Sequence, residues 1–360
     1  MKNLTVYLKP KSVVKKGGIR SDTLFGALIW GIRLLFEGRG LSSVTELLKR
    51  FKKDFKKPSF LISSTFAYVK TDGDRLIHLF PLPILEPIQP DFADWKKYKE
   101  FSGVSFVSDR VLEQIIKGEH RYIEIYNQFT WLVKADDGYA KVNPDARFVK
   151  IGKALFDADE ADLLIQRTDT GILKEYELQR NAIDRLSGGT IEGKLFYDSL
   201  ISFKSGSGLC FFLKVEDEFE TYLRGALKFL ADKGIGGDST IGHGAFEILE
   251  IRDGLPLTEP VNGSHFITLS LYYPTNEEAE DYSIRSGDVW YDLVRRRGRI
   301  ESSFITGQDV RKQMVLMFAE GSTFPDSGKS FYGENPIVRN QPFEIQHYGC
   351  AFPIRMVVKK

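Results

Sequence analysis

The segment from residue 208 to residue 251 constrains the fold of this chain most, because a strand, a helix, a glycine-rich loop and a second strand follow one another directly. Residues 208–215 (GLCFFLKV) have the continuous apolar character of a buried strand, and residues 245–251 indicate the closing strand. The helix expected over 217–233 has one apolar stripe, formed by Phe219, Tyr222, Leu223, Ala226 and Leu230. This order predicts half of a ferredoxin-like unit.

The same order occurs near the start of the chain. Residues 4–8 alternate like a short strand, residues 9–20 form a basic loop, and Ser21 or Asp22 can cap a helix over 23–36. A chain of 360 residues exceeds what one core usually serves. We therefore expect an α+β protein with tandem ferredoxin-like domains, one over residues 1–205 and one over residues 206–360.

Two additions to the first domain are expected. Residues 86–170 mix prolines, charged helix-like pieces and polar loops, which indicates an insertion. Residues 175–203 have strand-like ends around a turn at 187–189, which predicts a long β-hairpin. Further strands are expected at 59–69, 79–85, 265–272, 310–318 and 345–358.

Positive charge gathers at one end of the chain, although the formal net charge is only +1. Residues 1–57 contain 14 Lys and Arg, Lys11 and Arg20 among them, against four acidic residues. Acidic residues gather at 157–162, 216–220 and 277–281. A polyanion and a basic protein surface are the partners that this distribution suits. A scatter of solvated faces explains the charges equally well.

The cysteine count and hydropathy indicate a cellular compartment. Cys210 and Cys350 fall in strand-like segments and form neither a disulfide framework nor a zinc-binding spacing, which is typical of a reducing cytosol. The N-terminus has no apolar signal core, and no stretch reaches transmembrane length. We expect a cytoplasmic protein with no metal, no other cofactor and no membrane partner.

The glycine-rich loop at 234–244 (GIGGDSTIGHG) is the strongest candidate for a binding site. Its five glycines allow close approach of the backbone to a ligand and positive φ angles. It is not a P-loop, because no Lys follows the last glycine and the loop leads from a helix to a strand. A long flexible connection is the alternative. The residues predicted to contact a phosphate or sugar are Gly236, Gly237, Ser239, Thr240, Gly242, His243 and Gly244.

The expected hairpin carries a second group of candidates, Arg180, Asn181 and Arg185, beside its turn. Arg and Asn side chains reach phosphates and unpaired base edges, whereas a salt bridge with Asp184 is the structural alternative. The run RRRGR at 295–299 suits either an RNA contact or a solvated hairpin tip.

His243 is the one histidine placed for acid–base chemistry. Cleavage of RNA through its 2′-hydroxyl needs a base, an acid and a stabilising charge at one phosphate, and His243 with Arg180 or Lys312 supplies part of that set. A histidine that only contacts or caps the loop is the favoured alternative.

Several stretches, in this order along the chain, resemble the RAMP superfamily, and specifically the group-five-type subunit of the type III-A (Csm) CRISPR effector complex. They are residues 21–33 (SDTLFGALIWGIR), 180–189 (RNAIDRLSGG), 234–247 (GIGGDSTIGHGAFE), 310–324 (VRKQMVLMFAEGSTF) and 348–354 (YGCAFPI). Relatives commonly carry Lys or Arg between the loop glycines, where this chain has Asp238, Ile241 and His243. We expect the basic N-terminal segment to supply that charge.

The resemblance implies tandem ferredoxin-like folds and a non-catalytic subunit in antiviral defence. It implies a grip on the 5′ handle of the crRNA, and docking onto the large polymerase-like subunit and the neighbouring backbone RAMP subunit. The glycine loop and Ser21 would hold the handle, the hairpin with Arg180 and Arg185 would act as a thumb, and Arg311 and Lys312 would line the same face.

Two other functions remain open at this stage. One is a RAMP endoribonuclease that trims the CRISPR precursor RNA with His243 as general acid or base. The other is a protein-interaction module that touches no RNA, which the basic first 57 residues disfavour.

Overall fold

The computed structural model describes residues 1–41, 43–52, 57–88, 94–135, 138–165, 172–236, 241–300, 311–340 and 344–359. The helices are α1 (Ser21–Phe36), α2 (Val44–Lys49), α3 (Trp95–Ser102), α4 (Asp109–Ile116), α5 (Tyr122–Asn127), α6 (Ala158–Ile165), α7 (Asp217–Lys233) and α8 (Asn276–Ile284), with a 3₁₀ turn at Ser286–Asp288.

The strands of the first half are β1 (Lys2–Pro10), β2 (Val14–Lys15), β3 (Phe60–Ile62), β4 (Phe66–Lys70), β5 (Leu76–Pro81), β6 (Phe106–Ser108), β7 (Phe129–Ala135), β8 (Gly138–Lys141), β9 (Phe148–Ile151) and β10 (Ala154–Asp157). The later strands are β11 (Leu173–Ile183), β12 (Thr190–Phe203), β13 (Ser207–Val215), β14 (Phe246–Asp253), β15 (His265–Thr268), β16 (Leu293–Arg296), β17 (Val315–Phe318), β18 (Thr323–Pro325), β19 (Ile337–Arg339), β20 (Ile345–Gln346) and β21 (Pro353–Met356).

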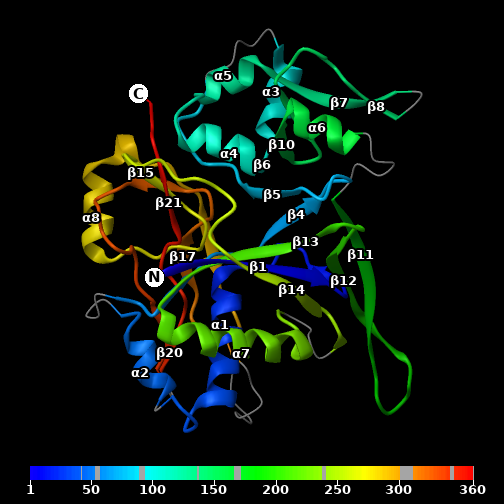
Figure 1. The fold of residues 1–360 in the computed structure, drawn as a ribbon. Helices are drawn as coiled ribbons and strands as arrows, with labels where there is room; N and C mark the ends of the chain where they lie inside the picture. Colours follow the sequence, from blue (N-terminus) through cyan, green and yellow to red (C-terminus); the bar gives the residue numbers. More distant parts are fainter. Residues whose placement is uncertain are drawn as a thin grey trace.

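One long sheet forms the centre of the molecule. Its strand order is β14-β1-β13-β4-β5-β6-β10-β9-β7-β8, and β3 also pairs with β13. β1 lies between β13 and β14 and pairs antiparallel with both. The apolar run predicted at 208–215 is confirmed as a central strand, because β13 is buried along almost its whole length. Helices α1 and α7 lie together below β1 and β13 in Figure 1.

The strand–helix unit near the start of the chain and the strand–helix–strand unit at 208–251 belong to one ferredoxin-like unit. β1, α1, β3, β13, α7 and β14 follow one another as βαββαβ, and their strands stand side by side in one sheet. β13, which begins just after the expected boundary between residues 205 and 206, pairs with β1 in this sheet. α1 and α7 approach closely where Gly31 meets Ala226, and a Cβ at residue 31 would lie 3.2 Å from the Ala226 methyl carbon.

The insertion expected at 86–170 extends the central sheet. Residues 94–165 contribute α3 to α6 and β6 to β10, and β6 continues the sheet by pairing with β5 (top of Figure 1). A buried polar chain ties the insertion to the first strand. The Tyr7 hydroxyl lies 2.9 Å from His78 Nε2, and His78 Nδ1 lies 3.0 Å from an Asp109 carboxylate oxygen.

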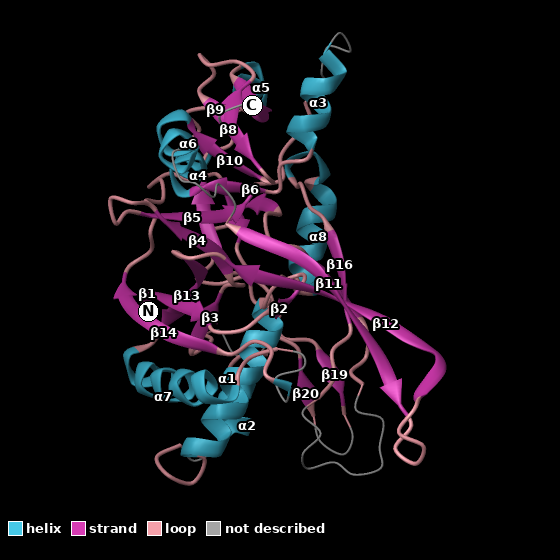
Figure 2. Cartoon of the chain, turned by 90° about the vertical axis from the view of Figure 1, so that its right-hand side faces the viewer, coloured by secondary structure: helices cyan, strands magenta, loops and turns pink. Residues whose placement is uncertain are grey.

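The hairpin predicted at 175–203 is present. β11 and β12 pair from Leu173 with Phe203 to Ile183 with Thr190, and the short strand β2 joins the base of β12. The ribbon leaves the body and ends in an exposed turn (Figure 2). A hairpin of this length in solvent presents both faces to a ligand.

The C-terminal residues form small sheets, β18-β15-β21, β16-β17 and β19-β20, around an aromatic cluster. These C-terminal residues contact α1 through Ser21 and Asp22, the two side chains that were expected to cap the helix. The helix begins at Ser21 after Arg20, and the Ser21 hydroxyl accepts a hydrogen bond from Leu271 N at 3.0 Å. The predicted capping roles of Ser21 and Asp22 are thus replaced by tertiary contacts.

Asp22 is the centre of this junction. Arg296 donates two hydrogen bonds to its carboxylate, at 2.8 and 2.9 Å, and His347 Nε2 lies 2.6 Å away. Burial alone would raise the pKa of Asp22, but the hydrogen bonds from His347 and Arg296 hold it well below its usual range. The N-terminal helix and the C-terminal residues are therefore joined by a buried ionic contact.

Candidate nucleic-acid interface

The glycine loop is anchored at both ends by its own backbone. Gly234 ends α7 at a φ of +85°, and Ile235 N then donates to Gly244 O at 3.0 Å. Gly244 N donates to Val13 O at 2.9 Å, so the loop is also tied to the basic N-terminal segment. Gly236, Gly242 and Gly244 all have positive φ, as the glycine content predicted. The predicted contacts Gly237, Ser239 and Thr240 lie outside the described residues.

His243 connects the glycine loop to the hairpin. An Arg180 guanidinium nitrogen lies 3.2 Å from His243 Nε2, and Arg180 Nε lies 2.7 Å from an Asp198 carboxylate oxygen. Since a guanidinium only donates, His243 Nε2 accepts and the proton of the neutral ring belongs on Nδ1. Nδ1 is buried and has no hydrogen-bond partner within the described part of the chain. The structure thus brings together two candidates that the sequence places 63 positions apart.

Asp198 and Lys15 belong to the same cluster but were not predicted. Lys15 Nζ lies 3.7 Å from the Asp198 carboxylate. Asp198 stands opposite Leu178 in the hairpin, diagonal to Arg180. The sequence did contain a signal, because Asp198 interrupts the apolar run of β12. Pairing the two strands of the hairpin around its glycine turn would have placed Asp198 diagonal to Arg180.

The hairpin tip carries exposed apolar and basic side chains. Leu186 is 99% exposed and Ile183 is 64% exposed, and Asn181 and Arg185 are also exposed. Asp184 accepts a backbone hydrogen bond from Leu186 N at 2.8 Å, which shapes the turn. No ion pair joins Asp184 to Arg185 in the described structure, and Arg180 pairs with Asp198 instead, so the salt bridge with Asp184 is not formed here.

Ion pairs offset much of the positive charge in the first 57 residues. Lys11 remains well exposed, but Arg20 lies 3.5 Å from Glu320 and Ser21 is fully buried. Ser21 therefore has no surface to offer a ligand. The pairs with distant acids are Lys2 with Glu220 and Asp253, Lys11 with Glu247, Lys16 with Glu175, Arg20 with Glu320, Arg50 and Lys57 with Glu216, and Lys52 with Glu344.

Arg311 and Lys312 lie away from the glycine loop, beside the C-terminal junction. Arg311 is exposed and forms a backbone bridge with Arg299, whereas Lys312 is only partly exposed. Burial lowers the pKa of Lys312, although the charge of Asp22 opposes that shift. Lys312 therefore faces the buried ionic contact, and Arg311 faces solvent.

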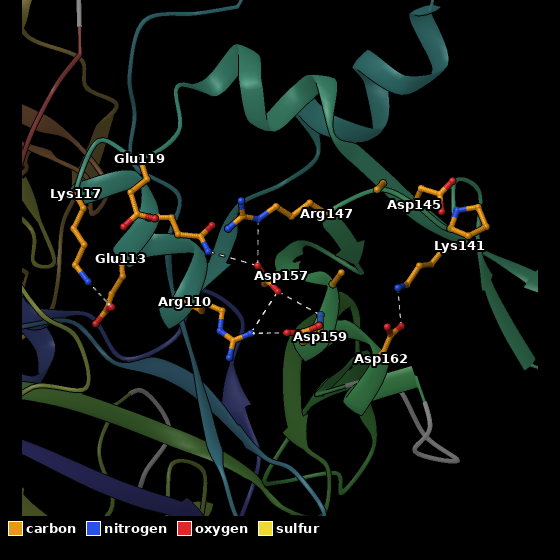
Figure 3. A pocket seen from close by; sticks show the side chains of 14 residues that line it. Arg110, Glu113, Lys117, Glu119, Lys141, Asp145, Arg147, Asp157, Asp159 and Asp162 are labelled. Atoms are coloured by element: carbon orange, nitrogen blue, oxygen red, sulfur yellow. Dashed lines mark hydrogen bonds and ion pairs between the residues drawn. The ribbon is translucent and has the colours of Figure 1, made fainter.

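A pocket with a volume of about 750 Å³ lies on the inserted region (Figure 3). It contains none of the predicted site residues. Its cations pair with neighbouring acids: Arg110 lies 3.4 Å and Arg147 lies 3.6 Å from Asp157, and Lys141 lies 2.7 Å from Asp162. The lining carries four cations and six acids, so the pocket offers no net positive charge to an RNA.

The described residues contain neither a cluster of metal-binding side chains nor a helix that could span a membrane. No group of three or more His, Cys, Asp or Glu residues is arranged to hold a metal ion in this part of the chain. None of the helices described is long and apolar enough to cross a bilayer.

Comparison with known proteins links both parts of the chain to described families. A model described as the RAMP superfamily matches residues 4–247, and one described as the CRISPR Csm4 C-terminal domain matches residues 261–356. The interval between the two matches, residues 248–260, contains most of β14.

Curated relatives and solved structures carry related names. The CRISPR system Cms protein Csm4 of Thermococcus onnurineus (strain NA1) is 29% identical over 182 residues, 49% of this chain and 53% of that protein. Its namesake from Mycobacterium tuberculosis (strain CDC 1551 / Oshkosh) is 34% identical over 90 residues, 25% of this chain and 29% of that protein. The chain thus spans less than two thirds of either relative.

Two solved structures share the fold over the whole chain. A crystal structure of a Csm3-Csm4 subcomplex in the type III-A CRISPR-Cas interference complex aligns with a TM-score of 0.63 and 16% identity, covering 99% of this chain and 100% of that one. A Csm1-Csm4 cassette in complex with pppApA aligns with a TM-score of 0.58 and 18% identity, covering 100% of both chains.

Proposed function

The chain belongs to the RAMP superfamily and is a Csm4-type subunit of the type III-A CRISPR system, and from this we propose that it holds the 5′ handle of the guide RNA without cleaving it. The observation that carries the proposal is the bond between hairpin and loop. Arg180, in the outer half of the hairpin, lies 3.2 Å from His243 in the glycine loop. A single strand that crosses this junction would meet backbone amides of the loop on one side and Arg and Asn side chains of the hairpin on the other.

The exposed hairpin tip supports the thumb role proposed for this element. Arg185 has no described ion pair to neutralise it, and Leu186 next to it is almost wholly exposed. An unpaired guanidinium can bind a phosphate, and an apolar side chain can pack against the face of an unstacked base. We propose that Arg185 and Leu186 contact the guide near the end of its handle.

The environment of His243 favours a binding role over catalysis. Its Nε2 is occupied by the Arg180 guanidinium, and its Nδ1 is buried. A general base needs a free lone pair within reach of the 2′-hydroxyl, and this ring presents none in the described arrangement. We therefore favour a non-catalytic subunit over the endoribonuclease.

The partners proposed for the chain are the large polymerase-like subunit and the backbone RAMP subunit. The solved structures that share the fold come from complexes titled Csm1-Csm4 and Csm3-Csm4. The two similar chains thus occur with both kinds of neighbour, and we extend that assembly to this protein.

The test is retention of guide RNA by the purified complex. Arg185→Gln removes one charge-assisted hydrogen bond, worth about 1.5 kcal/mol, so we expect roughly tenfold weaker RNA binding without loss of folding. Lys99→Gln, on the exposed surface of α3, is the matched control. Unchanged RNA affinity in the Arg185 variant, with a folded complex, would count against the thumb.

Incubation with precursor RNA separates the binding role from the enzyme. We expect the RNA to stay intact with the unmodified chain. Cleavage that disappears in His243→Ala would establish the endoribonuclease instead.

A further inference from the structure

The strands β16 and β17 form a two-stranded ribbon with one buried and one exposed face. Arg295 stands opposite Leu316 and Arg296 opposite Val315, and an isolated bridge joins Arg299 to Arg311 beyond the end of the two strands. Because side chains alternate across a strand, residues of even number in β16 point inward. Arg296 accordingly binds Asp22, and Met317 on β17 is 1% exposed.

The exposed face carries arginines without partners. Arg295, Arg297 and Arg299 are exposed, and none has a side-chain hydrogen bond or an ion pair in the part of the chain that is described. Arg295 lies in β16, and Arg297 and Arg299 follow it in the segment that leads out of the strand, so the three exposed arginines are close together in sequence at one end of the ribbon. Among the residues that the structure describes, Asp292, just before β16, is the acid closest to them in sequence.

Apolar side chains stand among these arginines. Tyr291, Leu293, Met314 and Leu316 are each about half exposed, at 51%, 48%, 57% and 52%. The Tyr291 ring packs against Phe318 at 4.9 Å between centroids, which fixes its orientation. A group of cations with interleaved aromatic and aliphatic groups suits a single-stranded nucleic acid, whose phosphates need charge and whose bases need faces to stack on.

The ribbon is connected to the glycine loop through the segment that leads into α1. Ala245 N donates to the Ser12 hydroxyl and Gly244 N donates to Val13 O, at one end of this segment. At its other end, Asp22 binds Arg296 of the ribbon. One short stretch of chain thus supports both surfaces.

We propose that the outer face of the β16–β17 ribbon is a second contact surface for single-stranded RNA, separate from the glycine loop and the hairpin (β16 in Figure 2). This inference rests on the proposed function. The ribbon also supplies positive charge that is not neutralised by neighbouring acids. The cations of the N-terminal segment largely pair with acids, whereas Arg295, Arg297 and Arg299 have no ion pair among the described residues.

The test measures how RNA affinity depends on salt. The full chain and its variant Arg295→Gln/Arg297→Gln/Arg299→Gln are titrated with a labelled, unstructured RNA at several salt concentrations. Each phosphate contact on a single strand contributes a slope of about 0.7 to log affinity against log salt, so the triple variant should lose about 2. The control Lys99→Gln/Lys134→Gln/Lys228→Gln removes the same charge from exposed positions elsewhere and should keep the slope.

The outcomes distinguish this inference from the proposed function. An unchanged slope in the triple variant, with binding still weakened by Arg185→Gln, overturns the ribbon surface alone. Failure of the unmodified chain to bind RNA overturns both. Normal RNA binding with lost association to a partner subunit makes the ribbon a protein contact and also overturns the inference. If the triple variant fails to fold, each single variant should lower the slope by about 0.7.

Discussion

Two glycines of the loop differ in what surrounds them, although both have positive φ. At Gly244, a Cβ would collide with the carbonyl oxygen of Ile235, whose amide bonds Gly244 O in return. At Gly242, nothing lies within 4 Å of the added atom. Gly244 therefore closes the loop, and Gly242 only turns it.

This contrast gives a prediction at the scale of the residue. Gly242→Ala should cost about 1 kcal/mol, because an L-residue resists positive φ. Gly244→Ala should cost about 3 kcal/mol, because the steric collision is added to the same strain. Urea unfolding of both variants measures the difference. Equal losses would contradict a closing role for Gly244.

The sequence predicted local features of the site better than tertiary ones. The helix over 217–233, the hairpin and the positive φ angles follow from patterns within a few residues, and all are present. The burial of Ser21 and the pairing of Arg20 depend on residues 250 or more positions away, for which one sequence gives no periodic signal. Burial of this kind leaves no local pattern in the sequence.

At the scale of elements, the inserted region meets the sheet through a buried carboxylate. Glu160 at the start of α6 is fully buried, and it accepts hydrogen bonds from Arg75 at 2.6 Å and from Ser108 at 2.5 Å. Burial raises the pKa of Glu160 from its ordinary 4.5 to about 7, and the nearby charge of Asp109 adds to the effect.

The raised pKa predicts how stability depends on pH. Between pH 4.5 and about 7 the folded protein holds a proton that the unfolded chain has released, so stability falls as pH rises through this window. The contribution of one proton approaches about 1.4 kcal/mol per pH unit. Glu160→Gln should remove this slope, and Asp159→Asn, on the exposed side of α6, should keep it. Urea midpoints at several pH values test this, and an unaltered slope in Glu160→Gln would refute it.

The order of the elements in the sheet was not accessible from the sequence. The two strand–helix–strand patterns were recognisable in the sequence, but the pattern of one strand does not show which other strand it pairs with in the sheet. β13 could have opened a second sheet, and instead it lies beside β1. Sheet pairing depends on contacts between distant segments, which the alternation of apolar residues in either segment does not specify.

At the scale of the whole molecule, the buried contact around Asp22 joins α1 to the C-terminal residues. Asp22→Asn leaves Arg296 and His347 without their counter-charge, and we expect a loss of about 3 kcal/mol in the free energy of unfolding. Arg33→Ala breaks the exposed pair with Glu37 on the same helix and should cost no more than about 0.5 kcal/mol. Denaturant titration compares the two, and similar losses would mean that the junction does not stabilise the fold.

The position of β1 between β13 and β14 also determines when the protein can fold during its synthesis. Thr5 on β1 donates a hydrogen bond to the carbonyl of Gly254, 249 positions further along the chain. During synthesis β1 therefore has neither of its neighbours in the sheet until β13 and β14 have been made, and both of its edges stay unpaired in the meantime. A chain cut short before β14 would keep one of these edges open, and we expect such a fragment to aggregate more readily than the whole chain.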